Sequence, residues 1–318
     1  KTVFTIHNIQ YQGKYGKELL EDVLGIPGSA LPLLEYDNCV NMMKGAIETA
    51  NRVTTVSPTY AQEILDPWFS HKMDTILRER SWKLSGILNG IDTESYNPET
   101  DKDIYANYSV QDMSGKAVNK LELQKRLNLA ETPDVPLIGM VTRMVAHKGL
   151  DLVKETLDQL MWESNIQFVI LGSGDYEYET FFREMQNKYP GRLCACFGFV
   201  PELSRKIYAG ADIFLMPSKS EPCGLSQMIA LRYGTIPVVR ATGGLKDSIQ
   251  DSGDGEGNGF TFQSYNGGDM LYAIHRALEG YAQADGWKIL VDRAMKSDNS
   301  WGRSANDYIR MYRDMLKE

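Results

Sequence analysis

The sequence predicts an α/β protein built from two parallel-sheet domains, and three observations support this. The chain has 318 residues, about twice the roughly 150 residues of an ordinary single-core domain. Short apolar runs alternate with segments of helical periodicity, the pattern of parallel strands joined by helices. With 42% hydrophobic and 24% charged residues, the composition is typical of a folded globular protein rather than a disordered one.

Residues 1–92 carry the elements expected for the first domain. A polar loop, residues 7–13, follows the first expected strand directly. In chain order the expected elements are a strand at 2–6, an amphipathic helix at 39–50, a strand at 52–56, a helix after Ser57 and Pro58, and a strand at 86–88.

Residues 93–135 are interpreted as a linker region between the domains. The pairs Asn89-Gly90 and Asn97-Pro98 mark turns, and the polar stretch up to Gly115 has little periodicity. A short helix is expected at 116–127.

Residues 136–299 are predicted to form a complete second domain of nucleotide-binding type. Its expected elements are strands at 137–142, 167–171, 193–198, 211–216 and 236–239, and helices from Leu150, from Tyr176 and at 224–233. Residues 300–318 form a last helix, which either seals the second domain or crosses back onto the first.

Charge and hydropathy exclude several classes of partner. A formal net charge of -8 argues against nucleic acid and anionic membranes, because these require basic patches. No apolar run approaches the roughly 20 residues that span a bilayer, and residues 1–20 lack a secretory pattern, so a cytoplasmic location is the default expectation. An anionic substrate would need local Arg and Lys. The oligomeric state is left open.

Cysteine usage predicts no metal site. Cys39, Cys194, Cys196 and Cys223 are few for this length and lack paired metal-ligand spacing. Cys194 and Cys196 are expected to lie on one face of a strand rather than to bind zinc, and reduced thiols suit a cytosolic protein.

The junction between the strand at 211–216 and the following helix is the most informative segment. A helix that starts there presents unpaired N–H groups to an anion such as a phosphate, while the Glu221 carboxylate could accept bonds from neutral hydroxyls. The alternative is that Glu221 and Ser226 merely cap the helix.

Seven sequence blocks, read together, resemble the bacterial glycogen synthase and starch synthase family. They occur in the family's order across nearly the whole chain: His7–Gly13, Thr55–Tyr60, Gly86–Asp92, Arg143 with Lys148–Asp151, Leu171–Asp175, Glu221–Leu225 and Arg240–Leu245.

The resemblance implies a GT-B fold of two Rossmann-like domains with parallel sheets. It also implies retaining transfer of glucose from ADP-glucose to the non-reducing end of an α-1,4-glucan, with no cofactor and no metal. Residues 1–92 would be the C-terminal part of an acceptor-side domain that is incomplete in this chain. Residues 136–299 would bind the nucleotide sugar.

The resemblance assigns the main donor-site roles by position. Arg143 and Lys148 would hold the diphosphate and stabilise the charge on the departing ADP, since fixed cations do this where no metal is present; the alternative is an exposed salt-bridging pair. Glu221 would hold hydroxyls of the transferred glucose. Residues 224–226 would bind the distal phosphate: Gly224, Leu225 and Ser226.

Further positions carry weaker assignments. Gly172 lies in the block at 171–175 and is assigned to the donor site. Phe199 aligns with an aromatic near the adenine, although a core Phe is the plain alternative. Cys223 is interpreted as a pocket wall rather than a nucleophile. Asn89 falls at the family's sugar-contacting or hinge-adjacent position, which an Asn-Gly turn would also explain.

In the first domain His7 matches the family's active-site histidine near the sugar, although a lone His is more often structural. Three residues in the loop after it are candidates for contact with the acceptor glucan: Asn8, Tyr11 and Gln12.

Two departures from the family pattern bear on function. Ile229 occupies the place where other retaining GT-B transferases carry a second Glu, which favours the glycogen synthase branch. The family's N-terminal Lys-x-Gly-Gly-Leu loop does not lie upstream of Lys1, and the similar Thr242–Leu245 belongs to the second domain. The alternative is therefore a catalytically incomplete fragment that acts only as a nucleotide- or glucan-binding module.

Overall fold

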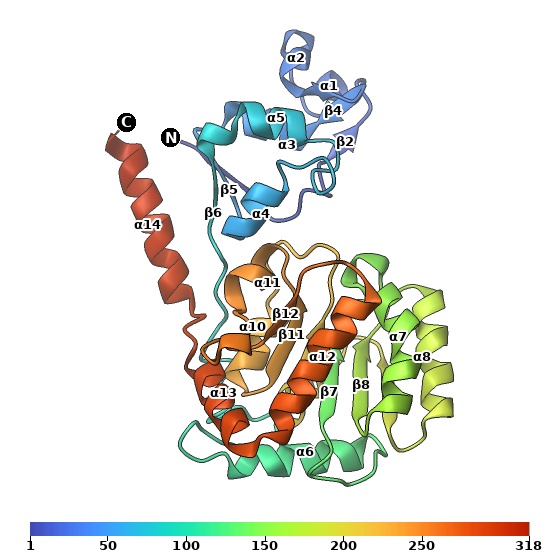
Figure 1. Ribbon diagram of the computed structural model, residues 1–318. Helices are drawn as coiled ribbons and strands as arrows, with labels where there is room; N and C mark the ends of the chain where they lie inside the picture. The colour runs from blue at the N-terminus through green and yellow to red at the C-terminus, as the bar shows by residue number, and fades with distance from the viewer. Residues whose placement is uncertain (318) are drawn as a thin grey trace. The chain divides into compact units, whose positions relative to one another are not determined.

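The computed structural model describes residues 1–317 and forms two compact units (Figure 1). The first comprises Lys1–Asn89 together with the chain from Ser304 onward, and the second comprises Gly90–Arg303. Each unit contains a parallel sheet, so the predicted α/β class is confirmed. Residues 93–135, interpreted from sequence as a linker region, belong by their contacts to the second unit.

The second unit is built on a six-stranded parallel sheet in the order β12-β11-β10-β7-β8-β9. In that order the strands are Phe260–Phe262, Ile236–Arg240, Ile213–Met216, Leu137–Val141, Gln167–Gly172 and Leu193–Phe197. All six residues of β8 are buried, as expected for a strand covered on both faces. The order reverses between β7 and β10, and open α/β sheets bind ligands beyond the carboxyl ends of the strands at such a switch point.

Helices surround this sheet in Figure 1, with α12 lying along its front and α7 and α8 beside it. The helices are α6 (Ser114–Arg126), α7 (Leu150–Glu163), α8 (Tyr176–Lys188), α9 (Pro201–Gly210), α10 (Ser226–Arg232), α11 (Gly243–Ser248), α12 (Gly267–Ala282) and α13 (Ala284–Lys296), with single 3-10 turns η3 (Ala146–Lys148) and η4 (Ser252–Asp254). Leu123 of α6 and Ile207 of α9 pack with Val169 of β8 in one core cluster. These helices therefore anchor the sheet that positions the loops at its carboxyl edge.

The first unit contains a three-stranded parallel sheet and a small antiparallel sheet. The parallel strands, in spatial order, are β1 (Val3–Ile6), β5 (Arg52–Thr55) and β6 (Leu84–Gly86). The antiparallel strands are β2 (Lys14–Tyr15), β4 (Cys39–Asn41) and β3 (Glu35–Tyr36). The helices are α1 (Leu19–Asp22), α2 (Leu31–Leu34), α3 (Met42–Thr49), α4 (Pro58–Glu63) and α5 (Asp74–Glu79), with 3-10 turns η1 (Gly28–Ala30) and η2 (Ser81–Lys83).

Two predicted boundaries in this unit are wrong. The helix expected at 39–50 begins only at Met42, because Val40 pairs with Tyr15 on one side and Glu35 on the other. The strand expected at 86–88 ends at Gly86, because pairing with β5 starts at Leu84.

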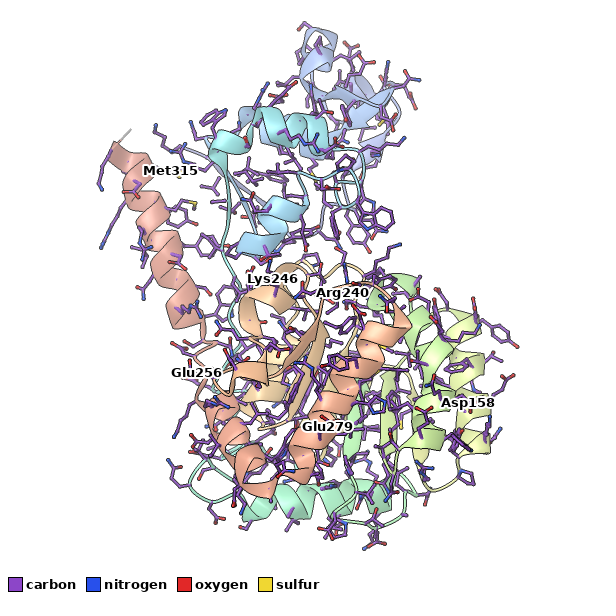
Figure 2. All side chains as sticks on the ribbon, viewed as in Figure 1. Asp158, Arg240, Lys246, Glu256, Glu279 and Met315 are labelled. Atoms are coloured by element: carbon purple, nitrogen blue, oxygen red, sulfur yellow. The ribbon has the colours of Figure 1, made fainter. Side chains whose placement is uncertain are left out.

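The last helix, α14 (Trp301–Lys317), contributes its residues from Ser304 onward to the first unit. The Ser304 hydroxyl donates to the Leu88 carbonyl at 2.5 Å, and Met315, labelled in Figure 2, is only 3% exposed. Among residues 1–317, no helix combines the length and the apolarity that crossing a membrane requires.

The two places where the chain passes between the units lie side by side on the second unit. The Ile91 N–H donates to the Asn299 carbonyl at 2.8 Å, and Ile91 forms a parallel bridge with Ser300. A Cβ on Gly90 would lie 2.3 Å from the Trp301 nitrogen, so only glycine permits this close crossing.

Candidate functional site

Glu221 lies in the loop between β10 and α10, on the carboxyl side of the switch point. Its residue is 6% exposed, and its Oε2 accepts hydrogen bonds from Lys148 Nζ at 2.6 Å and from Ser218 Oγ at 2.9 Å. Among residues 1–317, no donor binds its second carboxylate oxygen, Oε1. One oxygen is thus fixed by the protein and the other retains its capacity to accept a hydrogen bond.

Lys148 reaches Glu221 because the loop after β7 packs closely on the loop after β10. Gly149 adopts a φ of +76°, and a Cβ there would lie 2.1 Å from the Pro217 carbonyl oxygen. The Lys219 N–H donates to the His147 carbonyl at 3.0 Å. The glycine after Lys148 is therefore required for the two loops to meet.

Arg143 and His147 add positive or protonatable groups to the same loop. Arg143 is exposed, and its Nη2 lies 3.4 Å from His147 Nε2. Burial lowers the pKa of His147, and the positive charges of Lys148 and Arg143 lower it further. The loop therefore concentrates positive charge, which is the requirement for binding a polyanion. Sequence reasoning missed His147 because nothing in its spacing distinguishes it.

The start of α10 does not use the capping arrangement considered from the sequence. The helix begins at Ser226, two residues later than expected, and its N-cap residue is Leu225, which makes no side-chain cap bond. The Ser226 hydroxyl instead accepts a bond from the Tyr208 hydroxyl at 3.0 Å. Gly224 adopts a φ of +69°, a conformation that favours glycine.

The glycine pair Gly243-Gly244 supports the loop that carries Glu221. The Gly244 N–H donates to the Glu221 carbonyl at 3.1 Å, and a Cβ on Gly243 would lie 1.9 Å from the same oxygen. Thr242–Leu245 thus has a structural role in the second unit, where the sequence had placed it.

A cavity of about 370 Å³ at this edge brings together five of the predicted donor residues. These are Arg143, Gly172, Phe199, Leu225 and Ser226. Glu221, Lys148, Cys223 and Gly224 do not line it. Its wall also includes residues that the sequence did not single out, among them Tyr96, Ser204 and Tyr208.

The structure shows how three of the predicted donor-site residues are packed. Phe199 is 92% exposed, so the alternative of a core Phe is wrong. A Cβ on Gly172 would lie 1.8 Å from the Thr142 carbonyl oxygen, which explains the glycine at the end of β8. Cys223 is 7% exposed but does not line this cavity, so its interpretation as a pocket wall stays a prediction.

The candidates in the first unit lie at the end of β1 and in the loop after it. His7 is exposed, Asn8 is half-buried and Tyr11 is 64% exposed. Gln12 is 3% exposed, and its amide accepts from Asn41 Nδ2 at 2.9 Å and donates to the His71 carbonyl at 3.0 Å. The structure thus gives Gln12 a role in holding this unit together. Asn89 is half-buried at the end of the unit.

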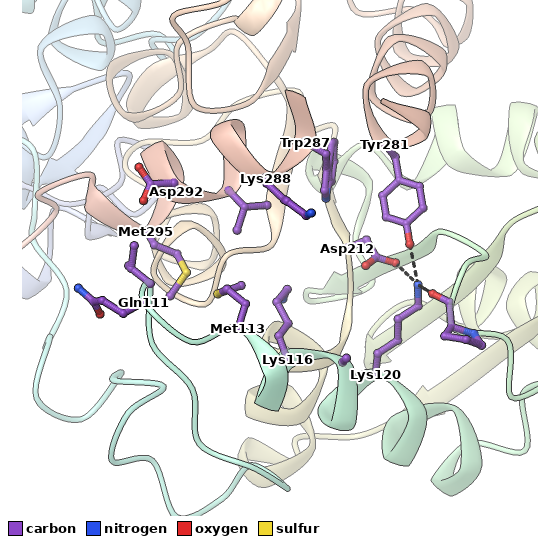
Figure 3. A pocket seen from close by; sticks show the side chains of 14 residues that line it. Gln111, Met113, Lys116, Lys120, Asp212, Tyr281, Trp287, Lys288, Asp292 and Met295 are labelled. Carbon is purple, nitrogen blue, oxygen red and sulfur yellow. Dashed lines mark hydrogen bonds and ion pairs between the residues drawn. The ribbon is translucent and has the colours of Figure 1, made fainter. Parts of the chain in front are cut away.

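A larger cavity of about 580 Å³ lies at the opposite, amino-terminal edge of the second unit's sheet (Figure 3). Lys120 Nζ donates there to Asp212 Oδ2 at 2.7 Å, to the Pro133 carbonyl at 2.7 Å and to the Tyr281 hydroxyl at 3.0 Å. Lys116 Nζ contacts four oxygens of the protein. The amino groups of both lysines are satisfied internally, so size alone does not make this cavity the functional site. Residues 1–317 contain no cluster of three or more His, Cys, Asp or Glu side chains placed to hold a metal.

Comparison with known proteins finds related sequences that cover the whole chain. Residues 1–79 match the family model for the starch synthase catalytic domain, and residues 122–289 match the model for glycosyl transferases group 1. The chain is 51% identical over 322 residues to the glycogen synthase of Geobacillus thermodenitrificans, covering 100% of this chain and 66% of that protein. It is 48% identical over 321 residues to a glycogen synthase of Bacillus cereus, covering 100% of this chain and 67% of that protein.

A solved structure shows the same fold. The catalytic domain of starch synthase IV from Arabidopsis thaliana, bound to ADP and acarbose, aligns with a TM-score of 0.90 at 38% identity, covering 99% of this chain and 67% of that one. The chain therefore spans about two thirds of the length of the relatives it matches. By these matches it belongs to the glycogen synthase and starch synthase family of glycosyltransferases, with the GT-B type of α/β fold.

Proposed function

We propose that this chain acts in a retaining glucosyltransferase that moves glucose from ADP-glucose to the non-reducing end of an α-1,4-glucan. The second unit would bind the nucleotide sugar at its carboxyl edge. Support comes from its relatives named as glycogen synthases and from the starch synthase IV domain bound to ADP and acarbose.

The Lys148–Glu221 pair is the observation that carries the proposal. The pair is largely buried, with side-chain exposures of 17% and 8%. Each member nevertheless retains hydrogen-bonding capacity: the ammonium has one partner for three N–H groups, and Glu221 Oε1 has none among residues 1–317. These unused hydrogen-bonding positions are available to a ligand, and they suit a phosphate and a sugar hydroxyl.

The roles follow from charge. Lys148 and Arg143 stabilise the negative charge that develops on the departing ADP, and no metal or cofactor takes part in the proposed transfer. Glu221 holds glucose hydroxyls through Oε1 while Ser218 and Lys148 fix Oε2. Phe199 and the cavity wall receive the nucleoside end. In the first unit, His7 stays a candidate for contact with the sugar, and Asn8 and Tyr11 stay candidates for contact with the acceptor. A cytoplasmic location stays a prediction.

The test is release of ADP from ADP-glucose with and without glycogen, together with ADP affinity measured by calorimetry. Lys148→Ala is expected to lower glycogen-dependent release by about 100-fold or more, the effect of losing one charge-stabilising donor. The matched control is Lys188→Ala, which removes a lysine from the exposed ion pair with Asp158 and is expected to leave release unchanged.

Equal activity of the Lys148→Ala and native chains, with both folded, contradicts the proposed role of Lys148. ADP binding by the native chain without glycogen-dependent release supports the alternative of a binding module that does not turn over.

A further inference from the structure

Cys194 and Cys196 form a close pair of thiols that the proposed transfer does not use. They stand two residues apart on β9, so their side chains point to the same face of the strand. Their sulfur atoms lie 3.8 Å apart, and both residues are free and half-buried. The prediction that both cysteines lie on one face of a strand is therefore confirmed. The structure adds that their sulfur atoms are close together, which the sequence could not show.

The strand that carries the pair can deform locally. β9 is an edge strand of the six-stranded sheet and pairs only with β8. On its outer side the Ala195 N–H is held by a side chain, Gln186 Oε1, at 2.7 Å. No second strand of the described chain fixes that side, so bending β9 breaks fewer ladder bonds than bending an inner strand.

The spacing permits a covalent bridge with some strain. Two residues of a strand advance by about 6.6 Å, which lies near the upper limit of roughly 6.8 Å between the Cα atoms of disulfides. The sulfurs must therefore approach each other, and the strand must shorten slightly. A strained disulfide is more easily reduced than a structural one, which makes the bridge reversible.

The surroundings give the two thiols different chemistry. The hydrogen bond between the two thiols lowers the pKa of Cys196; burial opposes this, and the positive charge of Arg126 adds to the lowering. The same hydrogen bond raises the pKa of Cys194, and burial adds to this. Cys196 is thus the better attacking thiolate and Cys194 the resolving thiol.

We propose that Cys194 and Cys196 are a modification site, a dithiol that low-molecular-weight disulfides oxidise reversibly to an intramolecular disulfide. The Cys196 thiolate attacks the disulfide, forms a mixed disulfide and releases one thiolate. That thiolate takes the proton of Cys194, whose sulfur then attacks Cys196 Sγ and expels the second thiolate. The second thiolate takes up the proton that Cys196 lost on forming its thiolate. In sum the protein loses two protons and two electrons, and the small disulfide becomes two thiols.

The bridge has a route to the nucleotide cavity. β9 continues through Phe197 into Gly198, at a φ of +115°, and then into Phe199, which lines the cavity. Gly198 N–H is held by the Gly172 carbonyl at 2.9 Å. Shortening β9 shifts this turn, so oxidation is expected to weaken ADP binding. This second part rests on the proposed function.

The test is intact mass and peptide mapping of the folded chain after incubation with glutathione disulfide. The expected product is lighter by two hydrogens, carries the bridge between Cys194 and Cys196, and reverts with dithiothreitol. Cys194→Ser and Cys196→Ser should not form it, with Cys196→Ser also losing the first mixed disulfide. Cys39→Ser, a cysteine of the first unit, is the control that should still form it.

A bridge involving Cys39 or Cys223, or a stable glutathione adduct on native Cys196 without closure, overturns the proposal. The mass measurement does not depend on nucleotide binding, so it separates this proposal from the proposed function. Equal ADP affinity of the reduced and bridged chains overturns the link to the cavity.

Discussion

The two edges of the second unit's sheet each hold a buried lysine–carboxylate pair. The pairs differ in how many of their hydrogen-bonding groups lack a partner within the protein. At the amino edge, the Lys120 ammonium donates to Asp212, Pro133 and Tyr281. Asp212 also accepts a hydrogen bond from the Leu137 N–H at 2.8 Å. At the carboxyl edge, Lys148 and Glu221 bind each other, and within residues 1–317 Ser218 is the one further partner of their charged groups.

This contrast teaches that a buried ion pair by itself does not mark a functional site. Both pairs are short, at 2.7 Å and 2.6 Å, and the amino edge has the larger cavity. What distinguishes them is unused hydrogen-bonding capacity, because buried groups that are fully satisfied have nothing to offer a ligand. The amino-edge pair is expected to serve stability and the carboxyl-edge pair to serve binding.

The largest effect is expected from Asp212→Asn. Removing this charge leaves the Lys120 ammonium buried without its counter-ion, which costs about 3–5 kcal/mol of unfolding free energy. Urea unfolding measures this, and calorimetry of the folded fraction should show unchanged ADP affinity. Asp158→Asn, in an exposed pair with Lys188, is the control and should cost less than about 1 kcal/mol. If Asp212→Asn weakened ADP binding instead, the assignment of stability to the amino-edge pair and of binding to the carboxyl-edge pair would be wrong.

Glu221→Gln tests the carboxyl-edge pair in the same way. The amide keeps the size of the side chain and removes its charge, so glycogen-dependent ADP release is expected to fall about 100-fold. The unfolding free energy should fall by less than for Asp212→Asn, because Lys148 is partly open to solvent. Glu177→Gln, which alters an exposed pair with Lys154, is the matched control for activity. A loss of stability as large as that of Asp212→Asn would contradict this.

The smallest effect concerns pH and His147. Its lowered pKa means that the unfolded chain binds the proton more readily, so this residue reduces folding stability as the pH falls below about 6.5. A bound diphosphate counters the charges of Lys148 and Arg143, raises the pKa of His147 and so favours proton uptake.

ADP affinity is therefore expected to gain a few-fold contribution from His147 between about pH 7 and pH 6. Calorimetry of the native chain and of His147→Gln across this range measures it. ADP itself takes up a proton near pH ~6 in both proteins, so the difference between them isolates the residue. Identical pH profiles would show that His147 does not face the phosphates.

Much of the second unit's fold could be predicted from sequence because its strands are buried on both faces. Runs such as residues 167–171 are recognisable without knowledge of their partners. The β4 strand was missed because its three residues are set by pairing with β2 and β3, which lie far from it in sequence. The start of α10 moved from Gly224 to Ser226 because Gly224 adopts a φ of +69°, outside the right-handed helical region.

Site residues could be predicted where the chemistry of a single side chain indicates its role. They were missed where the role depends on a hydrogen-bond partner that lies far away in the sequence. Arg143, Lys148 and Glu221 follow strands of a parallel sheet, so their place at one edge could be inferred. Ser218 and Tyr208 were missed, because a hydroxyl becomes informative only when its partner, Glu221 or Ser226, is known. Gln12 shows the reverse, since its bonds to Asn41 and His71 explain a residue that the sequence offered as an acceptor contact.

The side-by-side crossings at Ile91 and Ser300 have a consequence for synthesis on the ribosome. The second unit is one continuous segment whose two ends are joined to each other, so it can close as soon as its own residues have emerged. The first unit begins earlier but receives α14, with Ser304 and Met315, only after the second unit is complete. Of the two units, the one that begins earlier in this chain therefore receives its last helix only after the other has emerged in full.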